Sequence, residues 1–166
     1  MKLKLVSGGQ TGVDRAALDV AMRLGLPCGG WCPEGRRAED GPIPDRYPLK
    51  VLSGADYRAR TRANVADSDA TLLVYFEELA GGTRLTLQFC LELDKPFKLI
   101  DAAEIPPRQG AQALARFIAR HKTKVLNVAG PRASQAPLGY AYAYELLLTW
   151  LSAHPIDDDG LAASMD

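Results

Sequence analysis

Residues 3–15 of this 166-residue chain constrain its fold most, because an apolar run, a glycine turn and a helical pattern follow one another there. Leu3, Leu5 and Val6 are β-compatible, so the run is predicted to be a buried strand. The three glycines within residues 8–12 let backbone N–H groups approach a ligand without a Cβ in the way. The stretch therefore predicts the first strand–turn–helix unit of an α/β domain.

The residues after this turn have an apolar stripe of helical period. The stripe comprises Val13, Ala16, Ala17, Val20, Ala21 and Leu24. Thr11 and Asp14 have the spacing of a capping box, and Gly25 stands where a cap glycine ends a helix. A helix N-terminus behind a glycine turn is predicted to bind an anion. The alternative is a tight connection without a ligand, because the turn fits neither the Walker A nor the dinucleotide motif.

The rest of the chain alternates strand-like runs with helical patterns. Strands are predicted at 26–30, 47–52, 70–76, 97–100 and 125–129, and helices at 56–67, after residue 83, at 108–121 and at about 136–153. Residues 31–42 are too polar, and too interrupted by glycine and proline, for a regular element, so a functional loop is expected there. The pattern predicts a doubly wound α/β fold with a mainly parallel sheet and helices on both faces.

Composition limits the classes of partner. The length suits one ligand-binding domain, residues 1–153, followed by a flexible acidic tail, residues 154–166. Lys+Arg and Asp+Glu both number 20, so we expect neither nucleic acid nor an anionic membrane surface as a partner. The sequence shows no apolar run of membrane-spanning length and no secretory signal. The odd cysteine count, with no complete zinc motif, favours free thiols in a reducing cytoplasm and no metal site.

Glycine turns recur at residues 81–83 and 130–134, each before a predicted helix. Strand-to-helix turns of a parallel sheet share its carboxyl edge, where ligands bind. Three such turns with arginines nearby in the chain predict a phosphate-bearing small molecule as ligand. The candidate binding residues are Gly8, Gly9, Gln10, Thr11, Gly12, Arg15, Gly81, Gly82, Thr83, Gly130, Arg132 and Ser134.

Two further candidate regions leave alternatives open. Arg36 and Arg37 are suited to bind an anion in a bidentate manner, but the acidic residues Glu34, Glu39 and Asp40 beside them could instead neutralise them. The predicted helix 56–67 has a polar face that could reach the strand ends. That face comprises Arg60, Thr61 and Asn64.

Several of these motifs together resemble the putative molybdenum carrier family over roughly residues 3–152. They are Ser7–Asp14, Gly29–Gly41, Asn64-Val65 with Ser68-Asp69, Gly81–Thr83 and Gly130–Arg132. The resemblance implies a Rossmann-like fold related to the lysine decarboxylase-like (LOG) proteins. It also implies that the ligand is molybdenum cofactor, whose pterin carries a phosphate, or a nucleotide-like molecule.

The first functional hypothesis is a carrier that holds a small anionic ligand on the turn 8–12, with Gly82, Thr83 and Arg132 completing the cradle. The alternative is a nucleoside 5′-monophosphate phosphoribohydrolase, an N-glycosidic hydrolase of the LOG type. The LOG motif Gly-Gly-x-Gly-Thr-x-x-Glu ends here in Gln88, and an amide cannot act as a carboxylate base. The catalytic acid is therefore unassigned. Its candidates are Asp14, Glu34, Glu39 and Asp40.

The last predicted helix is apolar around most of its circumference. Leu146, Leu147 and Leu148 are consecutive and point about 100° apart, so one sheet face cannot bury all three. Exposed tyrosines and leucines favour interfaces, so we predict a homo-oligomer, most simply a dimer, through this helix. The alternative is that neighbouring elements of the same chain cover the second face.

Overall fold

The computed structural model describes residues 3–154 and contains a five-stranded sheet of order β2-β1-β9-β7-β8. The strands are β1 (Lys4–Val6), β2 (Cys28–Gly29), β7 (Ala70–Tyr75), β8 (Phe97–Asp101) and β9 (Val125–Ala129). All pairings within this sheet are parallel. The predicted α/β fold class is thereby confirmed.

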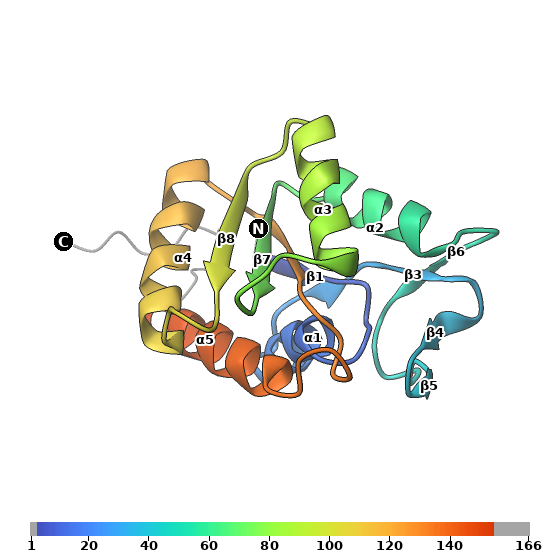
Figure 1. Cartoon of the computed structure of the whole chain (residues 1–166), viewed down its shortest axis with the longest axis horizontal. Coiled ribbons are helices and arrows are strands. Elements are labelled where there is room, and N and C mark those ends of the chain that lie inside the picture. The colour runs from blue at the N-terminus through green and yellow to red at the C-terminus, as the bar shows by residue number, and fades with distance from the viewer. Residues whose placement is uncertain (1–2, 155–166) are drawn as a thin grey trace.

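Helices cover both faces of the sheet (Figure 1). They are α1 (Val13–Arg23), α2 (Tyr57–Ala66), α3 (Gly81–Glu92), α4 (Pro107–His121) and α5 (Gly139–Ala153). Helix α5 packs between α1 and α4 on one face, whereas α2 and α3 pack against each other on the other. Among residues 3–154, no helix has both the length and the apolarity that a membrane crossing requires.

The two faces differ in chemistry because strand residues alternate in direction. Leu72 and Leu126 belong to the large core beneath α1, α4 and α5. On the α2–α3 face the buried strand residues include Thr71 and Asn127, whose side chains are joined by a 3.3 Å hydrogen bond. The smaller apolar cluster under α2 and α3 contains Val65, Phe89 and Cys90. Residues of α2 and α3, the helices on this face, line the cavities described below.

The expectation that residues 31–42 lack regular elements was wrong. They form β3 (Trp31–Pro33), a 3₁₀ turn η1 (Glu34–Arg36) and the antiparallel pair β4 (Arg37–Ala38) and β5 (Gly41–Pro42). Strand β3 pairs in parallel with β6 (Lys50–Leu52). A small core stabilises the region. It consists of Leu18, Cys32, Ile43, Tyr47 and Leu49. These strands are too short to show a period in the sequence.

The side-chain caps predicted for two helices were also wrong. Gly12 is the N-cap of α1 without a side-chain cap, so Thr11 and Asp14 form no capping box. Helix α5 begins at Gly139, and Ser134 precedes it. The three cysteines are free thiols, as interpreted from the sequence. The predicted tail lies outside the described residues, apart from His154.

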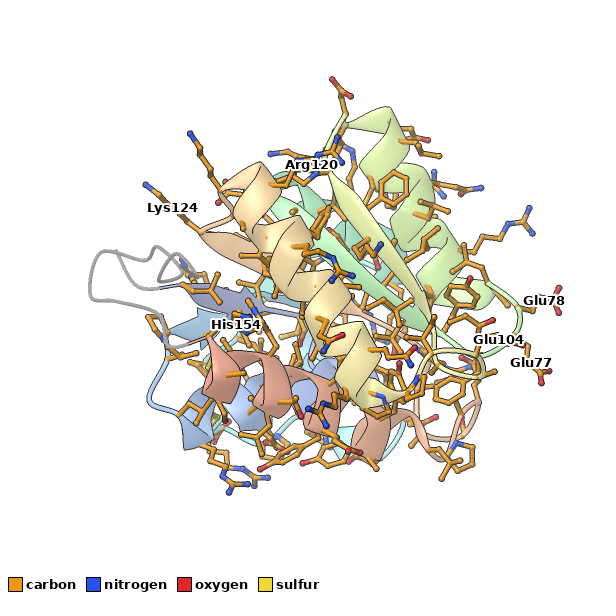
Figure 2. All side chains as sticks on the ribbon, turned by 90° about the vertical axis from the view of Figure 1, so that its left-hand side faces the viewer. Glu77, Glu78, Glu104, Arg120, Lys124 and His154 are labelled. Carbon is orange, nitrogen blue, oxygen red and sulfur yellow. The ribbon has the colours of Figure 1, made fainter. Side chains whose placement is uncertain are left out.

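Helix α5 is largely covered within one chain. Leu146 and Leu147 are buried, and Leu148 is half-buried against the same core. Figure 2 views the side where α4 and α5 lie next to each other. The three consecutive leucines therefore do not by themselves require a second chain, and oligomerisation stays a prediction.

Candidate functional site

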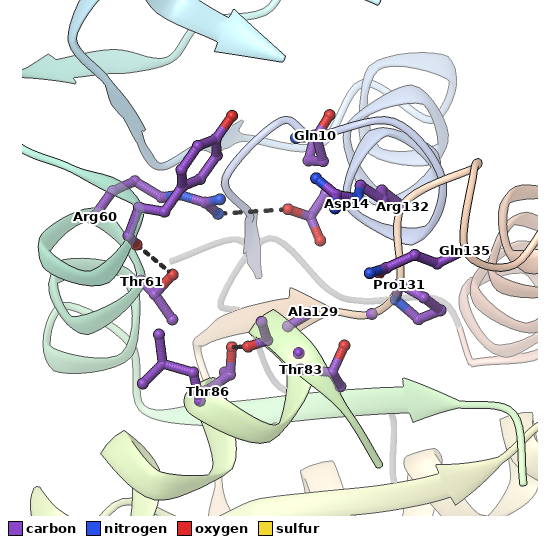
Figure 3. Close-up of a pocket in the computed structure, with 15 residues that line it drawn as sticks. Gln10, Asp14, Arg60, Thr61, Thr83, Thr86, Ala129, Pro131, Arg132 and Gln135 are labelled. Atoms are coloured by element: carbon purple, nitrogen blue, oxygen red, sulfur yellow. Dashed lines mark hydrogen bonds and ion pairs between the residues drawn. The ribbon is translucent and has the colours of Figure 1, made fainter. Parts of the chain in front are cut away.

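A pocket of about 340 Å³ opens at the carboxyl edge of the sheet (Figure 3). The turns after β1, β7 and β9 meet here because these strands lie close together in the sheet order. Helix α2 closes the remaining side. The lining residues are Gln10, Asp14, Tyr57, Arg60, Thr61, Gly81, Gly82, Thr83, Leu85, Thr86, Ala129, Gly130, Pro131, Arg132 and Gln135. A doubly wound sheet binds ligands at this edge.

Only some of the binding residues predicted from the sequence line this pocket. Its walls include Gln10, Gly81, Gly82, Thr83, Gly130 and Arg132. Gly8 lines a much smaller adjoining cavity. The predicted residues that line neither cavity are Gly9, Thr11, Gly12, Arg15, Arg36, Arg37 and Ser134. Hydrogen bonds and contacts within the chain show what most of these residues do instead.

The backbone groups of the first turn point into the protein. Backbone groups of Gly8, Gln10 and Gly130 face the carboxylate of Asp14 and lower its pKa. A Cβ at Gly8 would overlap Nη1 of Arg60, so this glycine makes room for a guanidinium. The space that the sequence assigned to a phosphate is thus filled by the guanidinium of Arg60.

Gly12 brings the first and third turns into contact. Its φ of 83° is in the region that favours glycine, and a Cβ there would lie 2.5 Å from the carbonyl oxygen of Pro131. The N–H of Val13 donates to the same oxygen at 3.5 Å. This part of the α1 N-terminus is therefore packed against backbone and offers no open face to a ligand.

Glu39, at the tip of the β4–β5 hairpin, reaches the same two turns. Its carboxylate accepts hydrogen bonds from the Thr11 hydroxyl, the Ser134 N–H at 3.1 Å and the Ser134 hydroxyl at 2.6 Å. Nε of Arg132 lies 3.7 Å from it. The bonds from Ser134, and then from Thr11, lower the pKa of Glu39. Both hydroxyls therefore hold an anion that belongs to the chain itself.

The remaining predicted arginines have structural partners. Arg15 donates to both carboxylate oxygens of Asp40, at 2.9 and 3.2 Å, and to the carbonyl of Gly9. Arg36 donates to backbone carbonyl oxygens instead of to an anion or an acidic side chain. Its acceptors are Ile43, Pro44, Tyr47 and Leu49. Arg37 is exposed and donates to the carbonyl of Glu34.

The second glycine turn is open to the pocket. Helix α3 begins at Gly81 without a side-chain cap within residues 3–154. A Cβ added to Gly82 would meet no heavy atom of the described residues within 4 Å. Amides of a first helical turn have no acceptor within the helix and bear partial positive charge. With Arg132 half exposed at the rim, this is the part of the pocket best suited to an anion.

The pocket floor holds the ion pair of Asp14 and Arg60, joined by a dashed line in Figure 3. Nη1 of Arg60 is 3.6 Å from Oδ2 of Asp14. Burial raises the pKa of Asp14 to about 6, although Arg60 and the backbone hydrogen bonds oppose that shift. Asp14 was expected as part of a helix cap. Nothing in the sequence indicates that its side chain instead faces the pocket. Arg60 and Thr61 do reach the strand ends, as their shared helix face suggested.

Comparisons with other proteins gave one family match and one match to a solved structure. Residues 5–151 match the family described as "cpYpsA: Circularly permutated YpsA SLOG family". The chain is 43% identical to a protein whose crystal structure is described as a "Putative molybdenum carrier protein" from Syntrophus aciditrophicus SB. That similarity has a TM-score of 0.88 and covers 90% of this chain and 95% of the other. No curated protein gave a significant match.

These matches confirm the Rossmann-like fold and the resemblance to molybdenum carrier proteins that the glycine motifs predicted. The family match covers every strand of the central sheet except the first residue of β1, and all three glycine turns. The chain belongs to the circularly permutated YpsA SLOG family.

Proposed function

We propose that this protein binds a phosphate-bearing small molecule in the pocket at the carboxyl edge of the sheet. The uncapped, sterically open N-terminus of α3 carries the proposal. Helix amides at such a terminus favour negative charge. Arg132 at the rim and Arg60 at the floor add cationic groups. The phosphate is therefore assigned to the turn at Gly82, and the closed turn 8–12 has a packing role.

Molybdenum cofactor is the first candidate ligand, because the similar protein is described as a molybdenum carrier. The lining residues fit the organic part of such a ligand. Amides and Arg132 can hold the phosphate, and the half-exposed ring of Tyr57 can stack on a flat heterocycle. The described lining residues include no Cys or His that could ligate the metal. A nucleotide presents the same phosphate and ring chemistry and is the second candidate.

Native mass spectrometry of the purified protein tests the proposal by identifying any copurifying ligand. Guanosine monophosphate serves as the calorimetric probe, because its aminopyrimidinone ring resembles that of a pterin. Gly82→Asp places a carboxylate in the anion site, where an added Cβ meets no described atom within 4 Å, and Gly82→Asn is its uncharged control. We expect the aspartate to reduce affinity at least tenfold relative to the asparagine, about 1.4 kcal/mol. Equal affinities would remove the α3 turn from the site.

The phosphoribohydrolase remains a second candidate because of Asp14. Of the four acids that could replace the missing glutamate, Asp14 alone lines the pocket in the described part of the chain. Its pKa of about 6 suits a general acid or base near neutral pH. Gln88 is exposed and lies outside the pocket. Release of free base from a panel of nucleoside monophosphates, lost in Asp14→Asn, would support this activity; no release at high protein concentration would reject it.

We also propose a homo-oligomer, on the narrower ground of the apolar residues that stay exposed around the start of α5. Leu138 is 71% exposed, and Tyr140 is 37% exposed. Apolar and aromatic surface residues favour protein interfaces. Light scattering at micromolar concentration should give a multiple of the 18.0 kDa chain mass. A mass near 18.0 kDa would contradict the proposal.

A further inference from the structure

Arg60 is the buried cation of the pocket. It extends from α2, its side chain is 12% exposed, and its guanidinium lies across the backbone of Gly8. Cζ stands 5.4 Å from the ring centroid of Tyr57, so the aromatic ring flanks it on one side. A charged side chain in so enclosed a place requires partners, because burial removes its hydration.

The hydrogen bonding of this guanidinium is incomplete. Nε is fully buried and has no hydrogen-bond partner among the described residues. The contact with Asp14 is 3.6 Å long, beyond the 2.7–3.2 Å range of a typical N–H···O bond. A buried donor without an acceptor destabilises the native state. Arg60 lines the adjoining pocket, so an acceptor bound there would give this guanidinium a further partner.

The structural arginines of the same chain are different. Arg36 makes hydrogen bonds to backbone carbonyls through Nε, Nη1 and Nη2. Arg15 makes three hydrogen bonds and an ion pair with Asp40. Arg60 lines the pocket with a donor still unsatisfied. Arg15 and Arg36 thus have Nε, Nη1 and Nη2 all hydrogen-bonded, whereas Nε of Arg60 has no partner among the described residues.

We propose that Arg60 donates hydrogen bonds to an anionic oxygen of the bound ligand, and that Asp14, 3.6 Å from its guanidinium, is the counter-ion with which the ligand competes. This inference rests on the proposed function and adds a specificity-determining residue to it. A planar guanidinium can bind two oxygens of a phosphate or carboxylate at once. The ligand would then contact the protein at the α3 turn and at the floor.

Asp14 makes this contact dependent on pH. The groups that face it are Arg60 from α2 and backbone groups of Gly8, Gln10 and Gly130 from the two turns, with Arg132 farther out at the rim. Ionised Asp14 partly neutralises Arg60 and repels an anion, whereas protonated Asp14 does neither. Since its pKa is about 6, anion affinity should rise as the pH falls through 6.

The first experiment observes the Nε–H resonance of Arg60 by NMR in the wild-type protein during titration with guanosine monophosphate and with inorganic phosphate. We expect it to shift together with the amide of Gly82. A shift of the Gly82 amide without one at Arg60 would overturn this inference and leave the proposed function standing. If neither resonance shifts at millimolar probe, the proposed function fails, and the inference fails with it.

Substitutions complete the test. Arg60→Gln should reduce affinity for guanosine monophosphate at least tenfold, and Arg60→Lys should restore part of it. Arg62→Gln, on an exposed position of the same helix, is the matched control and should bind normally. Asp14→Asn should bind more tightly than the wild type at pH 7.5 and equally at pH 5; comparing both proteins cancels the titration of the probe itself. A ratio of affinities that does not change with pH would overturn the role of Asp14.

Discussion

The first glycine turn, residues 8–12, and the second, residues 81–83, have similar sequences but differ in what surrounds their glycines. Around Gly8 and Gly12 the space that glycine leaves is filled by Arg60 and by the carbonyl of Pro131. Around Gly82 no atom of the described part of the chain fills the corresponding space. Both turns lie at the carboxyl edge of the same parallel sheet, so topology does not separate them.

The difference shows that glycine in a strand-to-helix turn permits close approach without saying what approaches. At the first turn the approaching groups are the side chain of Arg60 from α2 and the backbone of the turn that contains Pro131. At the second turn the only nearby atom of residues 3–154 is Nε2 of Gln135, 3.8 Å from a Cβ built on Gly81. One turn therefore organises the fold, whereas the other is available to a ligand.

The largest expected effect comes from Gly12→Ala. The substitution places alanine at a φ of 83° and a ψ of −132°, and its Cβ lies 2.5 Å from the oxygen of Pro131. Strain at such a backbone position and overpacking against a backbone atom that cannot rotate away should together lower the unfolding free energy by about 3 kcal/mol or more. Urea denaturation measures it.

Gly82→Ala is the matched control for this comparison. It meets no neighbouring atom, so the unfolding free energy should stay within about 0.5 kcal/mol of the wild type. Its methyl group enters the pocket and should weaken ligand binding. If both alanine variants lost similar stability, the distinction between a closed and an open turn would be wrong.

The second prediction concerns the charge at the closed turn. The pKa of Asp14 is raised from 3.8 unfolded to about 6 folded, so the native state binds its proton more tightly. This group therefore destabilises the native state increasingly as pH rises from about 4 to about 6, by about 3 kcal/mol at completion. Unfolding free energies of the wild type and Asp14→Asn should diverge over this window, with the variant less dependent on pH. Parallel curves would contradict the buried ionised carboxylate.

The sequence predicted the central sheet because Leu72 and its neighbours form a continuous apolar run, typical of a parallel strand covered on both faces. It also predicted the edge at which the pocket opens, since the turns of parallel strands share that edge. The partner of each turn could not be predicted. Arg60 lies about fifty residues from Gly8 in the chain, and only packing of α2 brings them together. The anchoring of Glu39 likewise depends on a hairpin of two-residue strands.

The third prediction concerns Arg132→Ala. Arg132 lines the same pocket as the open turn at Gly82, and the substitution tests whether it binds the ligand there. If Arg132 donates a charge-assisted hydrogen bond to the ligand, its loss should cost about 1.5–3 kcal/mol. The side chain is 46% exposed, so solvent screening favours the lower end, about tenfold in affinity. Calorimetry with guanosine monophosphate measures it, with the exposed Arg37→Ala as control. Unchanged affinity would remove Arg132 from the site.

The smallest expected effect is that of Glu39→Gln, which loosens the hairpin from the closed turn without touching the open one. Hydrogen bonds from Ser134 and Thr11 lower the folded pKa of Glu39 below its usual 4.5. Its stabilising contribution is therefore present above about pH 4.5 and is lost as the pH falls through the folded pKa.

Because Glu39 lies at the surface, the loss at pH 7 should be less than about 1 kcal/mol. It should vanish in acid, where the wild-type carboxyl is protonated as well. Glu34→Gln is the control, since only the backbone carbonyl of that exposed residue is bonded to the hairpin. Faster tryptic cleavage after Arg37 in Glu39→Gln alone, with affinity for guanosine monophosphate retained, would show that the carboxylate anchors the hairpin. A large loss of affinity in the same variant would instead mean that the closed turn takes part in ligand binding, and the contrast between the two turns would have to be abandoned.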